Sequence, residues 1–358
     1  MKNNNYAVIM AGGIGSRFWP MSKASFPKQF LDILGTGETL IQQTFRRLSK
    51  LCPQENILIV TNKAYKSLCL DQLSEVLEEN ILCEPMMKNT APCITYASFK
   101  IAAKNPNANI IVAPSDHLIT NEEEFYKVIE NCFERCSQTD QLLTLGIQPS
   151  RPDTGYGYIQ FQDNTESNLE IFKVKTFTEK PNEDLAIQFI DSGDFLWNSG
   201  IFIWNTKSIL LNIRKYLRDI YDLFEEGNSF YNTEKEEEFI NRIYPACKNI
   251  SIDYGIMEKS ENVFVHKADF GWSDLGTWSS LHTHLPLDKN QNGVLGNDIH
   301  LYQSKDNIIN LPKNKTAIIE GLSGYIIVEN DNTLLICRKN SEQEIKSFVS
   351  NLKKDTKE

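Results

Sequence analysis

The stretch "YAVIMAGGIGSRFWPMSKASFPKQF", residues 6–30, decides the fold. It starts with an apolar run typical of a buried strand, followed by three glycines within four residues. Arg17, Lys23 and Lys28 come next, with no acidic residue among them. Glycines between a strand and a helix let backbone N–H groups approach an anion closely, and the helix N-terminus adds a favourable dipole. The stretch therefore predicts a strand, a polyphosphate-binding loop and a helix.

Two common phosphate-binding motifs are excluded by the same residues. No Gly-Lys-Ser/Thr closes the loop as in a P-loop, and Phe18 stands where the dinucleotide fingerprint needs its third glycine. The remaining alternative is a tight turn without a ligand, which the three unopposed cations disfavour.

Outward from this loop, short apolar runs alternate with helical segments. Strands are expected at 56–62, 80–85 and 109–117, and helices at 39–51, 64–77 and 91–104. This alternation is typical of βαβ units, so we predict an α/β fold with a Rossmann-like mixed, mostly parallel sheet flanked by helices. Ligands of such sheets bind at the carboxyl ends of the strands. Residues 12–17, 84–90 and 115–117 should therefore share one edge.

The rest of the chain is less regular. Beyond residue 155, strand-like runs and helices around 183–192, 206–226 and 234–244 suggest the far wall of a cleft. From residue 293, short strands recur about every nine residues, which favours a small β-solenoid, with a β-meander as the alternative. A closing helix is expected in "SEQEIKSFVSNLKK", with Ser341 as its N-cap.

Composition limits the possible partners. The 358 residues carry a net charge of −10, which argues against non-specific binding to nucleic acid or to an anionic membrane. No apolar run approaches the roughly 20 residues of a membrane span, so a cytoplasmic protein is expected. Eight cysteines occur without a CxxC, and Cys132 and Cys136 are expected to be buried thiols on one helix face rather than a zinc pair.

Eight motifs in order resemble those of the sugar-phosphate nucleotidyltransferases, and in detail those of the mannose-1-phosphate guanylyltransferases. They are "AGGIGSRFWPMSKASFPKQFL", "EPMMKNTAPC", "VAPSDH", "GYGYI", "FTEKP", "WNSGIF", "IDYGIMEKS" and "GWSDLGTW". The resemblance implies a catalytic domain over residues 1–288. It also implies a small C-terminal segment, 289–358, like a left-handed β-helix with a closing helix, without the isomerase domain of longer members.

The resemblance further implies transfer of GMP from GTP to α-D-mannose 1-phosphate, which yields GDP-mannose and pyrophosphate, with Mg²⁺ or another divalent cation. The sugar phosphate is mostly dianionic at pH 7, because its second pKa is near ~6, so no general base is required. His117 is accordingly expected to be structural, and Lys28, as a ligand-facing side chain, is not expected to contribute to the core.

Site residues follow from the matched motifs. The implied catalytic residues are Arg17, Lys28, Asp116, Lys180 and Asp274, and the implied metal ligands are Asp116 and Asp274. The implied nucleotide-binding residues are Ala11, Gly12, Gly13, Gly15, Ser16, Arg17, Lys28, Glu84, Pro85, Asn89, Thr90 and Ser115. The implied sugar-binding residues are Tyr156, Gly157, Glu179, Asn198 and Gly200.

Two alternatives stay open at this point. One is a related nucleotidyltransferase that uses another hexose 1-phosphate or nucleotide, and the other is a non-catalytic regulator that binds a nucleotide sugar. A homodimer through the C-terminal strands is the expectation from the family.

Overall fold

The computed structural model describes residues 2–162 and 170–355, which fall into two compact units. Unit 1 comprises Met1–Gly12, Thr44–Ser115 and Ile119–Trp272. Unit 2 comprises Gly13–Gln43, Asp116–Leu118 and Ser273–Glu358. Both units are therefore discontinuous in sequence. The predicted boundary between residues 288 and 289 stays a prediction.

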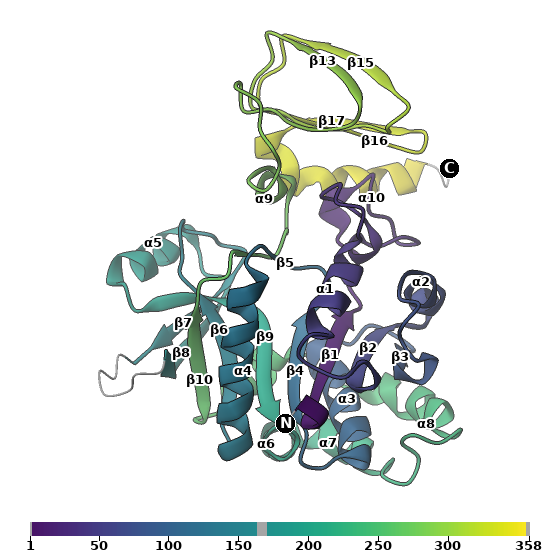
Figure 1. The fold of residues 1–358 in the computed structure, drawn as a ribbon, viewed down its shortest axis with the longest axis vertical. Coiled ribbons are helices and arrows are strands. Elements are labelled where there is room, and N and C mark those ends of the chain that lie inside the picture. Colours follow the sequence, from purple (N-terminus) through teal and green to yellow (C-terminus); the bar gives the residue numbers. More distant parts are fainter. Residues whose placement is uncertain (1, 163–169, 356–358) are drawn as a thin grey trace. The chain divides into compact units, whose positions relative to one another are not determined.

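Unit 1 is built on a nine-stranded sheet in the order β3-β2-β1-β4-β9-β6-β10-β8-β7 (Figure 1). Strands β1 to β4 are mutually parallel, whereas β9 runs antiparallel to both β4 and β6, which confirms the predicted mixed α/β sheet. The strands are β1 Asn5–Ala11, β2 Ile57–Asn62, β3 Ile81–Glu84, β4 Asn109–Pro114, β6 Leu142–Ile147, β7 Gly157–Phe161, β8 Ile171–Glu179, β9 Phe195–Asn205 and β10 Val263–Ala268.

Helices pack on this sheet through apolar residues. They are α2 Lys66–Gln72, α3 Thr90–Lys104, α4 Glu122–Gln138, α5 Glu183–Ser192, α6 Thr206–Tyr216, α7 Arg218–Glu225 and α8 Glu236–Ile243. Helices α3 and α6 to α8 share one core with the sheet, while α4 runs along the face nearest the viewer in Figure 1. The single helix expected over 206–226 is interrupted at Leu217, whose backbone leaves the helical region. As predicted, Cys132 and Cys136 are both buried on α4.

The C-terminal strands of unit 2 form a small coil. They are β12 Gly293–Leu295, β13 Asp298–Tyr302, β14 Ile308–Asn310, β15 Thr316–Glu320, β16 Tyr325–Asn330 and β17 Thr333–Arg338. Successive strands from β12 to β16 alternate between two sheets, and the pairs within each are parallel, which confirms the solenoid-like arrangement. The buried Asn307 amide donates to Asn292 Oδ1 (3.0 Å) and to the Leu322 carbonyl (2.9 Å), so it links successive turns. An antiparallel β16–β17 pair ends the coil.

The closing helix α10, Ile345–Asp355, starts later than expected. A 3₁₀ turn over Lys339–Glu344 precedes it, so Ser341 is not its N-cap and that detail of the prediction is wrong.

The core of unit 2 joins the two ends of the chain. Phe18, Leu31 and Ile33 pack with Ile326 of β16 and Ile345 of α10 in one buried cluster. The chain has two further short helices, α9 Trp278–His282 and α1 Leu40–Leu48. The sequence division between the units, at Gln43 and Thr44, falls within α1. The loop that follows β1 is therefore supported by the last strands and helix of the chain.

Two two-residue strands, β5 Leu118–Ile119 and β11 Trp272–Ser273, form a separate two-stranded sheet. Within residues 2–162 and 170–355, no helix is both long and apolar enough to span a membrane.

Candidate active site

In unit 1, three predicted positions lie at one edge of the sheet. β1 ends at Ala11, β3 ends at Glu84, and Ser115 directly follows β4. The parallel register places Met10 opposite Pro114, and the Ser115 N–H donates to the Met10 carbonyl at 3.0 Å. These residues therefore meet as the rule for parallel sheets predicts.

The Glu84 carboxyl group is almost fully buried at this edge. Burial raises its pKa to about 7, and a hydrogen bond from the Tyr244 hydroxyl opposes that rise. Its second oxygen, Oε2, would lie 3.4 Å from a Cβ placed on Gly12, so it faces the backbone of the glycine loop. Tyr244 directly follows α8, and no motif singled it out.

Asn89 and Thr90 start α3. Asn89 has a φ of 67°, a region that non-glycine residues rarely occupy, and its Oδ1 accepts from the Thr90 N–H at 2.9 Å. Thr90 Oγ1 accepts from the Ile252 N–H at 2.8 Å. Asn89 is therefore the N-cap of α3, and the half-buried Pro85 lies between this cap and the end of β3 in the sequence.

The predicted sugar-binding residues come together on β7, β8 and β9. Gly157 pairs with Glu179 in the β7–β8 register, and a Cβ on Gly157 would lie 2.4 Å from Glu179 Oε2 and 3.4 Å from Asn198 Cβ. A larger residue at this position would displace the Glu179 carboxylate. The Gly200 N–H, at a φ of 70°, donates to Asn198 Oδ1 at 3.2 Å.

Lys180 belongs to the same group. Its backbone N–H donates to the Tyr156 carbonyl at 3.2 Å, and its Nζ lies 3.2 Å from Glu179 Oε1. Lys180 has a φ of 47°, a conformation that costs of order 1–3 kcal/mol and that tends to persist at functional sites. The side chain is 63% exposed, so its charge is available to a ligand.

Asp253 was not predicted as a site residue although it stands in the matched "IDYGIMEKS" motif. Its Oδ1 accepts from Asn198 Nδ2 at 2.9 Å. Burial and the Glu179 carboxylate together raise the pKa of Asp253 to about 6, while its hydrogen bonds and Lys180 oppose this.

In unit 2, the glycine loop encloses Lys28. Gly15 has a φ of 66°, and a Cβ there would lie 2.3 Å from Lys28 Cβ, so this position requires glycine. The Lys28 N–H donates to the Ile14 carbonyl at 3.1 Å, and the Lys28 ammonium lies 5.5 Å from the centre of the Phe18 ring.

Lys28 also joins the two predicted metal-binding residues. Its Nζ lies 2.9 Å from Asp116 Oδ2 and donates to the Asp274 carbonyl at 2.8 Å. Although burial acts to raise the pKa of Asp116, the charges of Lys28 and His117 outweigh it, so the pKa lies below its usual range. Asp116 is thus a carboxylate at neutral pH. Lys28 itself is only 3% exposed, so it does contribute to the packing of unit 2, contrary to the expectation from sequence.

The rest of the loop differs from the expectation in one respect. No α-helix follows the glycines, because a 3₁₀ turn over Ser16–Phe18 leads into a long loop. The predicted helix dipole is therefore not part of this site. Arg17 donates from Nε to Gln343 Oε1 at 3.0 Å, and nothing would contact a Cβ placed on Gly13, which leaves its backbone open.

The donor set fits a hard divalent cation. Asp116 and Asp274 offer carboxylate oxygens, and Mg²⁺ commonly takes one or two carboxylates together with substrate phosphates and water. Across the part of the chain that the structure describes, no group of three or more His, Cys, Asp or Glu side chains forms a site of purely protein ligands. A cation here would accordingly need oxygens from a substrate.

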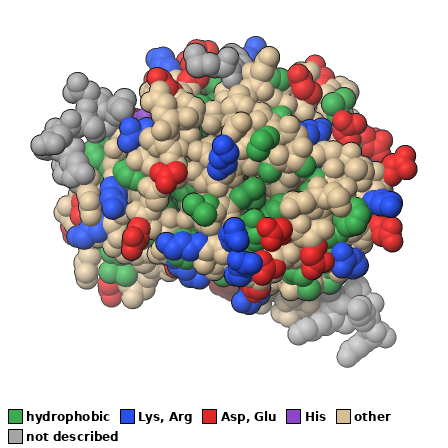
Figure 2. Space-filling view, turned by 90° about the horizontal axis from the view of Figure 1, so that it is seen from below, with side chains coloured by type: hydrophobic (Ala, Val, Ile, Leu, Met, Phe, Trp, Pro, Cys, Tyr) green, Lys and Arg blue, Asp and Glu red, His purple; other side chains and the backbone are tan. Residues whose placement is uncertain are grey.

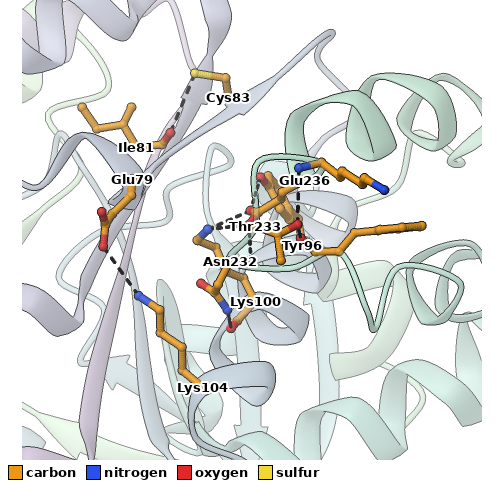
Figure 3. Close-up of polar contacts among 11 residues, drawn as sticks. Glu79, Ile81, Cys83, Tyr96, Lys100, Lys104, Asn232, Thr233 and Glu236 are labelled. Atoms are coloured by element: carbon orange, nitrogen blue, oxygen red, sulfur yellow. Dashed lines mark hydrogen bonds and ion pairs between the residues drawn. The ribbon is translucent and has the colours of Figure 1, made fainter.

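A hollow of about 700 Å³ lies beside the edge strand β3, between that strand and the start of α8 (Figure 3). Its lining includes Lys100 and Glu236, whose ion pair of 2.7 Å is buried, and Tyr96, whose hydroxyl donates to the same carboxylate at 2.7 Å. Lys104 lies 4.0 Å from Glu79. These charges pair with one another, and the Lys100–Glu236 pair joins α3 to the start of α8.

Charges of both signs are interspersed on the face shown in Figure 2. An anionic substrate must therefore be held by local cations, because the net charge of −10 produces a repulsive overall field.

The comparisons with known proteins show the family of the chain. Residues 6–291 match the nucleotidyl transferase family model. The chain is 36% identical over 363 positions to mannose-1-phosphate guanylyltransferase 2 of Escherichia coli O157:H7, an alignment that covers 97% of this chain and 73% of that protein. It is 32% identical to the mannose-1-phosphate guanylyltransferase of Escherichia coli K12, with 98% and 74% covered.

A solved structure, described as a mannose-1-phosphate geranyltransferase from Thermus thermophilus, has the same fold. It superposes with a TM-score of 0.86 at 27% identity and covers 98% of this chain and 99% of its own. On the family match and these relatives, the chain belongs to the nucleotidyl transferase family.

Proposed function

We propose that the protein transfers GMP from GTP to α-D-mannose 1-phosphate and releases pyrophosphate. The observation that carries this proposal is the buried Lys28 ammonium in unit 2, which contacts the Asp116 carboxylate and the Asp274 carbonyl, in a chain 36% identical to a mannose-1-phosphate guanylyltransferase. The phosphate oxygen of the sugar phosphate attacks the α-phosphorus, and the bond from that phosphorus to the pyrophosphate oxygen breaks.

The roles of the residues follow from the charges. Arg17 and Lys28 neutralise the triphosphate, and Lys180 acts on the phosphates near the reacting centre. Backbone N–H groups of the glycine loop, Gly12, Gly13 and Gly15 with Ser16, bind phosphate oxygens. Because the nucleophile is already an anion, these groups hold and orient it without removing a proton.

Asp116 and Asp274 would hold Mg²⁺ or another divalent cation. When bound, such a cation stabilises the negative charge that develops on the phosphate oxygens. Ala11 and Ser115 bind the nucleotide, and Glu84, Pro85, Asn89 and Thr90 lie on its nucleobase and ribose side. Tyr156, Gly157, Glu179, Asn198 and Gly200 bind the hexose, since buried hydroxyls need paired partners and an unpaired one costs ~1–3 kcal/mol.

One assay tests the proposal against its two alternatives. The protein is incubated with Mg²⁺, each nucleoside triphosphate and each hexose 1-phosphate, and pyrophosphate release is measured. GTP with mannose 1-phosphate should give the highest kcat/KM. A different preferred pair would identify a related nucleotidyltransferase, and no release with any pair would identify a non-catalytic regulator.

The metal assignment has its own test. Asp116→Asn and Asp274→Asn should each lower kcat by at least ~10²-fold, the effect of losing one preorganised electrostatic element. Asp71→Asn, at an exposed position of α2, is the matched control and should retain activity. Wild-type turnover by both site variants at saturating Mg²⁺ would remove the assignment.

A further inference from the structure

The amide of Asn198 is held in one orientation by its neighbours. Its Oδ1 accepts from the Gly200 N–H at 3.2 Å and lies 3.2 Å from Thr144 Oγ1, whose single hydroxyl proton is shared with the Ile201 carbonyl at 3.1 Å. Its Nδ2 donates to Asp253 Oδ1 at 2.9 Å. A carboxylate only accepts, so the nitrogen must face Asp253, and one N–H of the amide remains for a ligand.

Asp253 lies on a different part of the chain from the sugar-binding strands. It begins a single π-helical turn, Asp253–Met257. Such turns are rare in proteins, and those that occur often lie at functional sites. Its carboxylate is half-buried and has the Glu179 carboxylate nearby, an arrangement with an electrostatic cost. Within the described part of the chain, the side-chain hydrogen bond to this carboxylate comes from the Asn198 amide at 2.9 Å, so Asp253 is placed to fix that amide.

We propose that Asp253 is a positioning residue for the hexose-binding site, which acts by fixing the Asn198 amide so that its remaining N–H meets a sugar hydroxyl. The inference rests on the proposed function, because it assigns Asn198 to the hexose. The packing around Gly157 supports the inference, because Asn198 and Glu179 both lie against that glycine. A small displacement of the Asn198 amide would therefore alter its position relative to Glu179.

The expected effect falls on the sugar phosphate alone. Asp253→Ala should raise the KM for mannose 1-phosphate about 10-fold to 30-fold and leave the KM for GTP within about twofold, since a charge-assisted hydrogen bond is lost. Asp253→Asn keeps a neutral acceptor of the same shape, so it should recover most of the loss. Asp191→Ala, at an exposed position of α5, is the control and should match the wild type.

A double-mutant cycle separates positioning from direct contact. If Asp253 acts through Asn198, then Asn198→Ala and the double variant with Asp253→Ala should have the same KM for mannose 1-phosphate. Additive effects would overturn the inference, as would an equal loss for GTP. If Asp253→Ala does not fold, the same cycle with Asp253→Leu, which has a similar size and no acceptor, decides in the same way.

Binding without turnover gives an independent readout. In calorimetry, Asp253→Ala should bind GDP-mannose more weakly than the wild type does, whereas its affinity for GDP should equal that of the wild type. A wild-type protein that releases no pyrophosphate with mannose 1-phosphate contradicts the proposed function, whereas an active wild type with an additive cycle contradicts only the role of Asp253.

Discussion

Lys28 combines two roles that usually belong to different residues. It is buried and paired with Asp116, and it is also the cation proposed to face the triphosphate. Lys28→Met keeps much of the apolar stem and removes the charge. We expect kcat/KM for GTP and mannose 1-phosphate to fall ~10²–10³-fold, as for loss of a transition-state contact.

The same substitution should also lower the free energy of unfolding by about 1–3 kcal/mol, because Asp116 loses its partner. Lys127→Met is the control, since Lys127 is 70% exposed and pairs with Glu124 on the surface of α4. That variant should change stability by less than about 1 kcal/mol. Unaltered turnover in Lys28→Met would mean that the loop does not bind the triphosphate.

Glu84 gives a prediction that depends on pH. Its pKa is about 7 in the folded protein and 4.5 when unperturbed, so the folded state binds the proton more tightly. The contribution of Glu84 to the free energy of unfolding is therefore fully present below pH 4.5, falls as the pH rises to 7, and is constant above that pH. The contribution lost over this range is about 3 kcal/mol.

Glu84→Gln removes this dependence and keeps an acceptor for the Tyr244 hydroxyl. Urea unfolding at pH 5 and pH 8 should show the variant gaining stability relative to the wild type as the pH rises. A difference that is the same at both pH values would contradict the burial of an ionisable carboxyl group at this position.

Helix α8 carries the next prediction. Its first residue, Glu236, forms the buried ion pair with Lys100 of α3, and Tyr244 at its far end reaches Glu84. Lys100→Met should cost about 3–5 kcal/mol, because it leaves a buried carboxylate without its cation.

Lys104→Met is the matched control one turn further along α3. Lys104 is 40% exposed and 4.0 Å from Glu79, so the effect on the melting temperature should be small. A double variant, Lys100→Met with Glu236→Gln, that is more stable than Lys100→Met alone would support the Lys100–Glu236 ion pair. Equal melting temperatures for Lys100→Met and Lys104→Met would contradict it.

Local patterns predicted the elements well where local forces decide them. Helix α3 and the strands of the coil follow their apolar runs. The cap at Ser341 failed because the preceding turn is fixed by a distant contact, Glu342 accepting from the Ser279 N–H at 2.9 Å. Asp253 and Tyr244 were missed for the same reason, since their partners lie 55 and 160 residues away.

At the scale of the whole molecule, adjacent residues of β16 face different cores. Ile326 packs with Phe18 and Leu31 of the loop, whereas Ile327 packs inside the coil with Ile309 and Leu311. Replacing either by alanine should cost about 2–5 kcal/mol. Only Ile326→Ala should also lower kcat/KM, by about 10-fold, because only it loosens the loop that holds Lys28.

Steady-state kinetics well below both melting temperatures tests this difference. Equal kcat/KM values for Ile326→Ala and Ile327→Ala would show that the coil does not support the loop. Association of two copies through residues 293–337 stays a prediction, and light scattering of the intact protein tests it.

The core of unit 2, which contains residues from both ends of the chain, also determines when the loop after β1 can complete its contacts during synthesis. Arg17 and Gln343, which hydrogen-bond to each other, are 326 positions apart. At a translation rate of roughly 5–20 residues per second, the ribosome makes the second about 15–65 s after the first. The loop emerges among the earliest segments, yet it gains its contact with Gln343 among the last. The last strand of the unit 1 sheet ends at Ala268, so a nascent chain can form that sheet roughly 4–15 s before Gln343 is made.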